Sequence, residues 1–290
     1  MTDISSNLLI TRKLRQKFFI YFTASCVAFA LLVLIFLVVS SFYQGWKYLN
    51  WNFLNRFPSR FPDRAGLKAA LYGSAWVISF TGIITLIVGT GTAVFLEELT
   101  TRNKFSRILE VCIINLAGVP SIIYGILGLA VFARGFNFER SILTAALTLA
   151  LLILPVVTIS AREALRAVPQ SIRLAAFSLG ASRWQTAAAH VLPAAAPGIL
   201  TGFILSLSRA MGEAAPLILV GGLVYVTYVP NSIFDGFTVL PIQIFSWASR
   251  PQEEFQNLAA AGVVVLLGLL LILNSLVIAI RTRFESKQRW

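Results

Sequence analysis

The stretch RLAAFSLGASRWQTAAAHVLP, residues 173–193, is a polar segment between two long apolar runs, and its spacing predicts two short helices. Pro169 suits the first turn of the first helix, which we expect to continue from Gln170 to Leu179. Gly180 supplies the left-handed residue that ends this helix.

The second helix of this segment is predicted from its capping residues. Ser182 is the expected N-cap, Gln185 completes a capping box three residues later, and we expect Pro193 to stop the helix. Each helix has roughly 10 residues and is about 15 Å long, so neither spans a membrane. A membrane chain has little use for such a segment unless it docks onto a partner.

The composition indicates that the chain lies in a bilayer. Hydrophobic residues make up 57% of the sequence, charged residues 12%, and the mean hydropathy is +0.80, whereas soluble proteins carry about 25% charged residues. Cys26 and Cys112 lie in apolar runs and give no disulfide framework. His190 has no cysteine or carboxylate cluster around it, so no metal site is predicted. The basic excess implies contact with anionic lipid rather than with nucleic acid.

Six apolar runs are long enough to cross a membrane as helices, which takes about 20 residues each. We therefore expect an all-α membrane protein with a tail over residues 1–17 and one domain over 18–290. The six predicted spans are Phe18–Phe42, Ala69–Phe95, Ile108–Phe132, Ser141–Ser160, Pro197–Gly222 and Leu258–Ile280.

The distribution of lysine and arginine predicts the orientation. If the amino terminus is inside, fifteen of the 24 basic residues lie in inside segments and eight in outside loops. Because basic residues gather on the cytoplasmic side, we expect both termini and the loop over 161–196 in the cytoplasm. Glu97 and Glu98, at the start of another inside loop, are expected to be solvated.

The loop resembles the EAA loop of importer-type ATP-binding-cassette permeases. The resemblance rests on Ala175-Ala176, then Gly180 after three residues, then Leu192-Pro193 after eleven more. In that family the loop forms the coupling helix that contacts the ATPase. The resemblance therefore implies coupling roles for these residues and for Leu174. Two residues depart from the family pattern: Leu174 stands where the family has glutamate, and His190 stands where it has isoleucine.

Nearly the whole chain resembles the A-type permeases of bacterial phosphate-specific importers. This resemblance implies an inner-membrane importer-type permease fold, a heterodimer with a C-type permease, an ATPase dimer on the cytoplasmic side and an extracytoplasmic phosphate-binding protein. The matching segments are Phe57-Pro58-Ser59-Arg60, Ala93-Val94-Phe95-Leu96-Glu97-Glu98, Gly118-Val119-Pro120-Ser121-Ile122-Ile123-Tyr124-Gly125, Val168-Pro169-Gln170-Ser171 and Ser208-Arg209-Ala210-Met211-Gly212-Glu213-Ala214-Ala215-Pro216.

Arg209 and Glu213 are the predicted pathway residues of the fifth span. Arg209 lies twelve residues after Pro197, about 18 Å along a helix, near the middle of a core about 30 Å thick. Ionisable groups at such depth are functional by default. Four residues apart, the two share one helical face, so a neutralising ion pair is the structural alternative. A planar guanidinium suits an oxyanion such as phosphate.

Pro120 interrupts the third span, where it frees the carbonyl of Leu116 and is expected to bend or unwind the helix. Ser121 follows it, and both are candidate pathway residues. The small residues Gly118, Gly125 and Gly128 close by serve helix packing equally well.

The predicted function is that of a permease subunit forming half of a phosphate pathway. The chain has no phosphate-binding loop and no catalytic triad, so an enzyme is least favoured, and ATP and Mg are expected on partner ATPase subunits, with no cofactor in this chain. A sulfate or molybdate importer is the nearest alternative. A self-powered secondary transporter or channel, and a non-transporting scaffold or sensor, represent other classes.

Overall fold

A computed structural model describes residues 2–100, 103–222 and 225–286, and within these ranges every regular element is a helix. The elements are α1 (Thr2–Gly45), η1 (Trp46–Tyr48), α2 (Trp51–Asn55), η2 (Pro62–Arg64), α3 (Lys68–Val94), η3 (Phe95–Leu99), α4 (Lys104–Ala117), α5 (Ser121–Leu127), η4 (Gly128–Gly135), α6 (Ile142–Arg166), α7 (Gln170–Ser178), α8 (Arg183–Thr186), η5 (Ala187–Val191), α9 (Leu192–Met211), α10 (Ala215–Val220), α11 (Leu240–Ala248) and α12 (Glu253–Ser286).

The all-α membrane fold is confirmed. Five helical stretches are long and apolar enough to cross a membrane, and there are six if the bent pair formed by α4 and α5–η4 counts as one span. This pair turns by 109° at its break and coincides with the predicted third span. The remaining stretches coincide with the other five predicted spans, with shifted ends.

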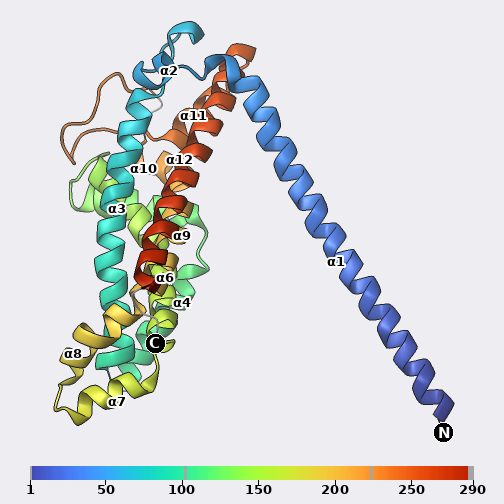
Figure 1. Cartoon of the computed structure of the whole chain (residues 1–290). Helices are drawn as coiled ribbons and strands as arrows, with labels where there is room; N and C mark the ends of the chain where they lie inside the picture. The colour runs from blue at the N-terminus through green and yellow to red at the C-terminus, as the bar shows by residue number, and fades with distance from the viewer. Residues whose placement is uncertain (1, 101–102, 223–224, 287–290) are drawn as a thin grey trace.

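The core lies where α3, α6 and α9 pack side by side (Figure 1). A cluster of buried side chains that includes Val77, Leu149 and Ile153 fills one part of this contact. A second cluster, near α7 and α8, includes Val94, Leu165 and Val191. Since burying a large aliphatic side chain contributes about 1.5–3 kcal/mol, these clusters fix α3 and α6 against each other over most of their length.

Helix α1 leaves this bundle. It meets α12 at its carboxyl end, where Gly45 approaches the backbone of Ala261, and then diverges from the other helices (Figure 1). Its apolar side chains are exposed, Phe18 and Phe36 among them. The residues predicted as a tail over 1–17 continue the same helix from Thr2. The start of α1 and the end of α12 lie toward the end of the molecule that carries α7 and α8 (Figure 1), which we call the α7 end.

The predicted end of the second loop helix is wrong. Pro193 does not stop the second helix of the loop, because α8, η5 and α9 form one helical stretch from Arg183 to Met211. The π-helical turn η5 ends two residues before Pro193, and such a turn shifts the hydrogen-bond register so that a proline fits without ending the helix. The fourth span also continues past Ser160 to Arg166, which adds two arginines to its end.

Candidate functional site

The first feature of the site is the break at Pro120 between α4 and α5. Helix α4 ends at Ala117, and Pro120, the residue before α5, has an extended ψ of 137°. The carbonyl of Leu116, four residues earlier, accepts a hydrogen bond of 2.6 Å from the Tyr124 hydroxyl. The predicted bend at Pro120 is confirmed. The Leu116 carbonyl also accepts from the amide of Val119 at 3.1 Å, so the Tyr124 hydroxyl adds a further partner at the break.

A second break separates Arg209 from Glu213. Helix α9 ends at Met211 with Gly212 as its C-cap, so Glu213 lies beyond the helix and the two side chains do not share a helical face. The expectation of one helix over Pro197–Gly222 is wrong here, because Gly212 precedes a second short helix, α10, that starts with Pro216 in its first turn.

Arg209 is exposed and Glu213 is half-buried. Among the described residues, no ion pair or side-chain hydrogen bond involves either of them, so the neutralising pair considered from the sequence is not formed. One residue before Arg209, the Ser208 hydroxyl donates a 2.7 Å hydrogen bond to Asn274 Oδ1 of α12. This contact ties α9 to α12 and leaves the cation beside it available to a ligand.

The two breaks lie close together. A Cβ added to Gly125 of α5 would lie 2.7 Å from Cα of Pro216 in α10, so the two short helices touch along their backbones. Tyr124 and Ala210 belong to one buried cluster, against which Val119 packs. Pro120 is exposed and Ser121 half-buried at this level. Two interrupted helices and an unpaired cation therefore meet in one region, and interrupted backbone at membrane depth is tolerated where it is buried or lines a water-filled cavity.

Gly125 and Gly128 have a packing role. The backbone contact of Gly125 leaves no room for a side chain, and at Gly128 an added Cβ would collide with the side chain of Thr148. Gly118 has ordinary space around it. The sequence left packing and pathway roles open for these glycines, and for Gly125 and Gly128 the geometry favours packing.

The loop forms the second part of the site, at the α7 end. Helix α7 begins after Pro169 and ends at Ser178, and Gly180 has a φ of +83°. The amides of Gly180 and Ala181 donate to the carbonyls of Phe177 and Ala176, which is the Schellman pattern. The predicted left-handed glycine is confirmed. It turns the chain so that α8 can start at once.

The second loop helix begins as predicted. The Ser182 hydroxyl accepts from the amide of Gln185 at 3.3 Å, and the Gln185 side chain accepts from the amide of Ser182 at 2.8 Å. Both bonds of the capping box are present. This box fixes the direction in which α8 leaves the turn at Gly180.

The turn presents apolar side chains to solvent. We call Leu174, Phe177, Leu179 and Trp184 the apolar tip; Leu179 is 89% exposed and Leu174 64% exposed. Of the residues given coupling roles, Leu174, Ala175, Gly180 and Pro193 are exposed, Leu192 is half-buried and Ala176 is buried. A protein in water rarely exposes such a group of large side chains without a partner for it.

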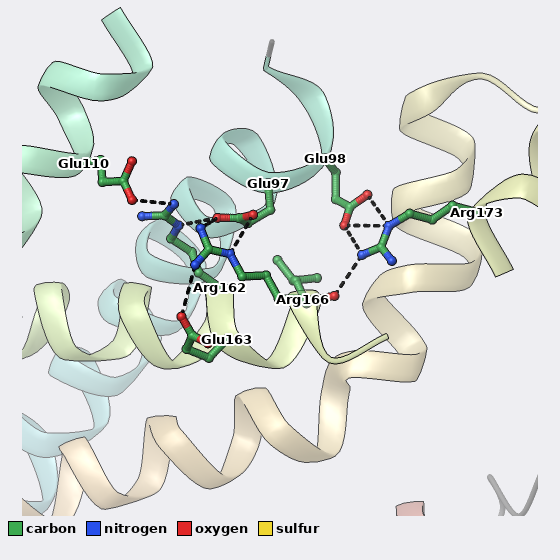
Figure 2. Close-up of polar contacts among 8 residues, drawn as sticks. Glu97, Glu98, Glu110, Arg162, Glu163, Arg166 and Arg173 are labelled. Atoms are coloured by element: carbon green, nitrogen blue, oxygen red, sulfur yellow. Dashed lines mark hydrogen bonds and ion pairs between the residues drawn. The ribbon is translucent and has the colours of Figure 1, made fainter. Parts of the chain in front are cut away.

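An ion-pair network behind the loop was not predicted. Figure 2 shows Glu97 between Arg162 and Arg166 of α6, with Glu110 and Glu163 at the edges, and Glu98 facing Arg173 of α7. The expectation that Glu97 and Glu98 are solvated is wrong, because their side chains are 16% and 8% exposed. The only sequence signal was that acidic and basic residues gather in two segments expected on the same side of the membrane.

Comparisons with known proteins agree with this architecture. A family model described as "Binding-protein-dependent transport system inner membrane component" matches residues 86–290. The chain is 34% identical over 237 residues to the phosphate transport system permease protein PstA of Mycobacterium leprae (strain TN), covering 80% of this chain and 76% of that protein. It is 29% identical over 259 residues to the probable ABC transporter permease protein YqgI of Bacillus subtilis (strain 168), covering 88% and 87%.

A solved structure shares the fold. The inward-facing MetNI methionine ABC transporter superposes with a TM-score of 0.57 at 20% sequence identity, covering 76% of this chain and 97% of the matched chain. At this identity the likeness concerns the helical architecture alone.

Proposed function

This chain belongs to the family of binding-protein-dependent transport system inner membrane components, and from that membership we propose that it is the permease subunit of an ATP-driven phosphate importer. The observation that carries the proposal is Arg209, which is exposed and has no side-chain partner among the described residues, beside two helix breaks. A planar guanidinium binds a tetrahedral oxyanion by paired, charge-assisted hydrogen bonds. The name of the M. leprae relative, a phosphate transport system permease, supports phosphate as that oxyanion.

In this proposal Arg209 meets the anion as it passes, and the pathway also includes Glu213, Pro120 and Ser121. The half-buried carboxylate of Glu213 lies on the short connection after α9. A change in that connection would bring Glu213 toward Arg209 or away from it, so that the carboxylate competes with the anion for the guanidinium. Such competition allows the anion to leave, since a site that binds too tightly does not conduct.

The chain is not itself the enzyme of the importer. We propose that ATP and Mg are bound by a dimer of ATPase subunits, that the apolar tip and Gly180 dock onto that dimer, and that this chain holds no cofactor. The exposed tip supports the docking, because its side chains gain about 25 cal/mol per Å² when a partner removes them from water.

A second permease subunit is expected beside this one. The exposed α1, which diverges from its own bundle, supports a lateral partner in the membrane, with lipid around the rest (Figure 1). We propose that the partner is a C-type permease that supplies the other half of the pathway, and that an extracytoplasmic phosphate-binding protein delivers the anion. The "binding-protein-dependent" description of the family supports the proposal of an extracytoplasmic binding protein.

The proposed location is the bacterial inner membrane, with both termini and the loop over 161–196 in the cytoplasm. In a background without Cys26 and Cys112, Arg183→Cys is therefore expected to react with a membrane-impermeant maleimide only after the cells are opened. Asn231→Cys, on an exposed loop whose carbonyls at Ile233 and Asp235 accept from the first amides of α6, is expected to react in intact cells. The reverse pattern of labelling would contradict the orientation and the docking of the tip to a cytoplasmic ATPase.

The cargo is tested by competition. Uptake of labelled phosphate by vesicles that contain the complete importer is expected to fall when unlabelled phosphate is added outside. The same excess of sulfate or molybdate should leave uptake within about twofold of the control. The reason is that hydrogen-bonding sites discriminate strongly between ligands that differ in their protons. Equal competition by sulfate or molybdate would favour a different oxyanion importer.

A further inference from the structure

Arg173, in the first turn of α7, binds three parts of the protein at once (Figure 2). Its Nε and Nη2 atoms donate to the carboxylate of Glu98 at 3.1 and 2.6 Å. Its Nη2 and Nη1 atoms also donate to the carbonyls of Leu165 and Val168, both at 2.8 Å. One guanidinium therefore joins η3 at the end of α3, the last turn of α6 and the connection that follows it, and α7. We call this set of bonds the Arg173 clamp.

The clamp is shielded from water. The side chain of Arg173 is 17% exposed and that of Glu98 is 8% exposed. Exposed ion pairs contribute little because water and salt screen them, whereas a shielded pair with bidentate geometry is both stronger and more costly to break on one side. The clamp is thus a defined connection, unlike the neighbouring pair of Arg166 and Glu163, in which both side chains are well exposed.

Helix α7 has few contacts with the spans besides the clamp. Of its nine residues, only Ala176 is buried, and Ile172 packs against the cluster that includes Val94, Leu165 and Val191. Among the described residues, no other side chain of α7 donates a hydrogen bond to α3, η3 or α6. The guanidinium of Arg173 is therefore the polar link from α7 to the ends of α3 and α6, beside the apolar packing of Ile172.

The receiving ends of α3 and α6 are locked together. Glu97 accepts from Arg162 Nε at 2.6 Å and from Arg166 Nη2 and Nε at 2.8 and 3.0 Å. Because consecutive residues of a helix point in directions about 100° apart, the adjacent carboxylates Glu97 and Glu98 of η3 reach different partners, one on α6 and the other on α7 (Figure 2). A force on Glu98 thus reaches α3 and α6 as one body.

We propose that Arg173 and Glu98 are positioning residues that transmit the movement of α7 to α3 and α6, and so couple nucleotide turnover to the state of the pathway. This inference rests on the proposed function. It assigns the transmission to a contact within this chain, separate from the apolar tip that holds the ATPase. Docking and transmission are then separable by substitution.

The test measures ATP hydrolysis by the complete importer in lipid vesicles, with inorganic phosphate and the binding protein added at increasing concentration. Glu98→Gln and Arg173→Gln are expected to keep wild-type amounts of ATPase in the purified complex and to keep the basal rate. Maximal stimulation by phosphate is expected to fall at least about tenfold, within the usual range of coupling energies between sites. The concentration that gives half-maximal stimulation stays within about twofold, because the substrate site is untouched.

Two further variants separate transmission from a merely structural role. Glu163→Gln makes the same change in the exposed part of the network and should preserve stimulation. Arg173→Lys keeps the charge but cannot reach the carboxylate and both carbonyls together, so an intermediate stimulation is expected. Loss of bound ATPase in parallel with activity would contradict the proposal, and so would full stimulation in Glu98→Gln. If phosphate did not stimulate ATP hydrolysis by the wild-type complex, the proposed function would be contradicted instead.

Discussion

Arg209→Gln is expected to lower phosphate uptake per assembled complex roughly 10- to 100-fold, because a hydrogen bond to a charged group contributes about 1.5–3 kcal/mol and each 1.4 kcal/mol is tenfold. The chain itself should assemble normally. Arg209 is exposed and no side-chain partner among the described residues depends on it, so its replacement leaves no buried carboxylate unpaired. The measurement is uptake divided by the amount of complex recovered from the same membranes.

Matched variants identify the property of Arg209 that matters. Arg209→Lys keeps the positive charge but loses the planar fork, so its uptake should lie between those of wild type and Arg209→Gln. The alternative is that Arg209 and Glu213 form an ion pair in another conformation and serve only to stabilise the protein. In that case the double variant Arg209→Gln with Glu213→Gln would regain near-normal uptake. Such recovery would contradict contact between Arg209 and the anion.

Leu179→Asp is expected to remove the ATPase subunits from the purified complex. Leu179 is the most exposed residue of the apolar tip. The few residues that dominate an interface cost about 2 kcal/mol or more when lost, which is roughly 30-fold in affinity, and we expect Leu179 to be one of them. An aspartate adds the cost of burying an unpaired charge. The variant should still insert and fold, because the side chain makes no buried contact in this chain. The readout is the ratio of ATPase to permease after affinity purification.

The control for Leu179→Asp is the same kind of change at an exposed apolar residue elsewhere. Trp51, at the start of α2, is 78% exposed and lies at the opposite end of the molecule from the tip (Figure 1). Trp51→Asp should retain the ATPase in full. If Leu179→Asp retained as much ATPase as Trp51→Asp, the apolar tip would not be the docking surface.

The features that could be predicted from the sequence depend on local physics. Long apolar runs predict spans because backbone groups in lipid need helical partners. Pro120 predicts its break because a proline lacks an amide hydrogen, and Gly180 and Ser182 predict a turn and a cap from their own conformational preferences. Each of these residues acts on neighbours within about four positions, so no knowledge of the tertiary structure is needed.

The features that were missed depend on distant contacts or on competing local signals. In the sequence, Glu97 and Glu98 resemble a solvated helix end. In the fold, they bind arginines of α6 and α7 that lie 65 to 75 residues away in the chain. A proline such as Pro193 usually ends a helix, but here the helix continues from the π-helical turn η5 into α9. The end of α9 at Met211 separates Arg209 from Glu213, although four-residue spacing in an apolar run favours a shared face.

The most direct test of the central claim is phosphate uptake by the purified, reconstituted complex with its binding protein outside and nucleotide enclosed in the vesicles. We expect labelled phosphate to accumulate in vesicles that enclose ATP and Mg, and not in vesicles that enclose ADP and Mg, with no ion gradient imposed in either case. Equal accumulation in the two preparations, or uptake that requires an imposed ion gradient, would contradict an ATP-driven phosphate permease.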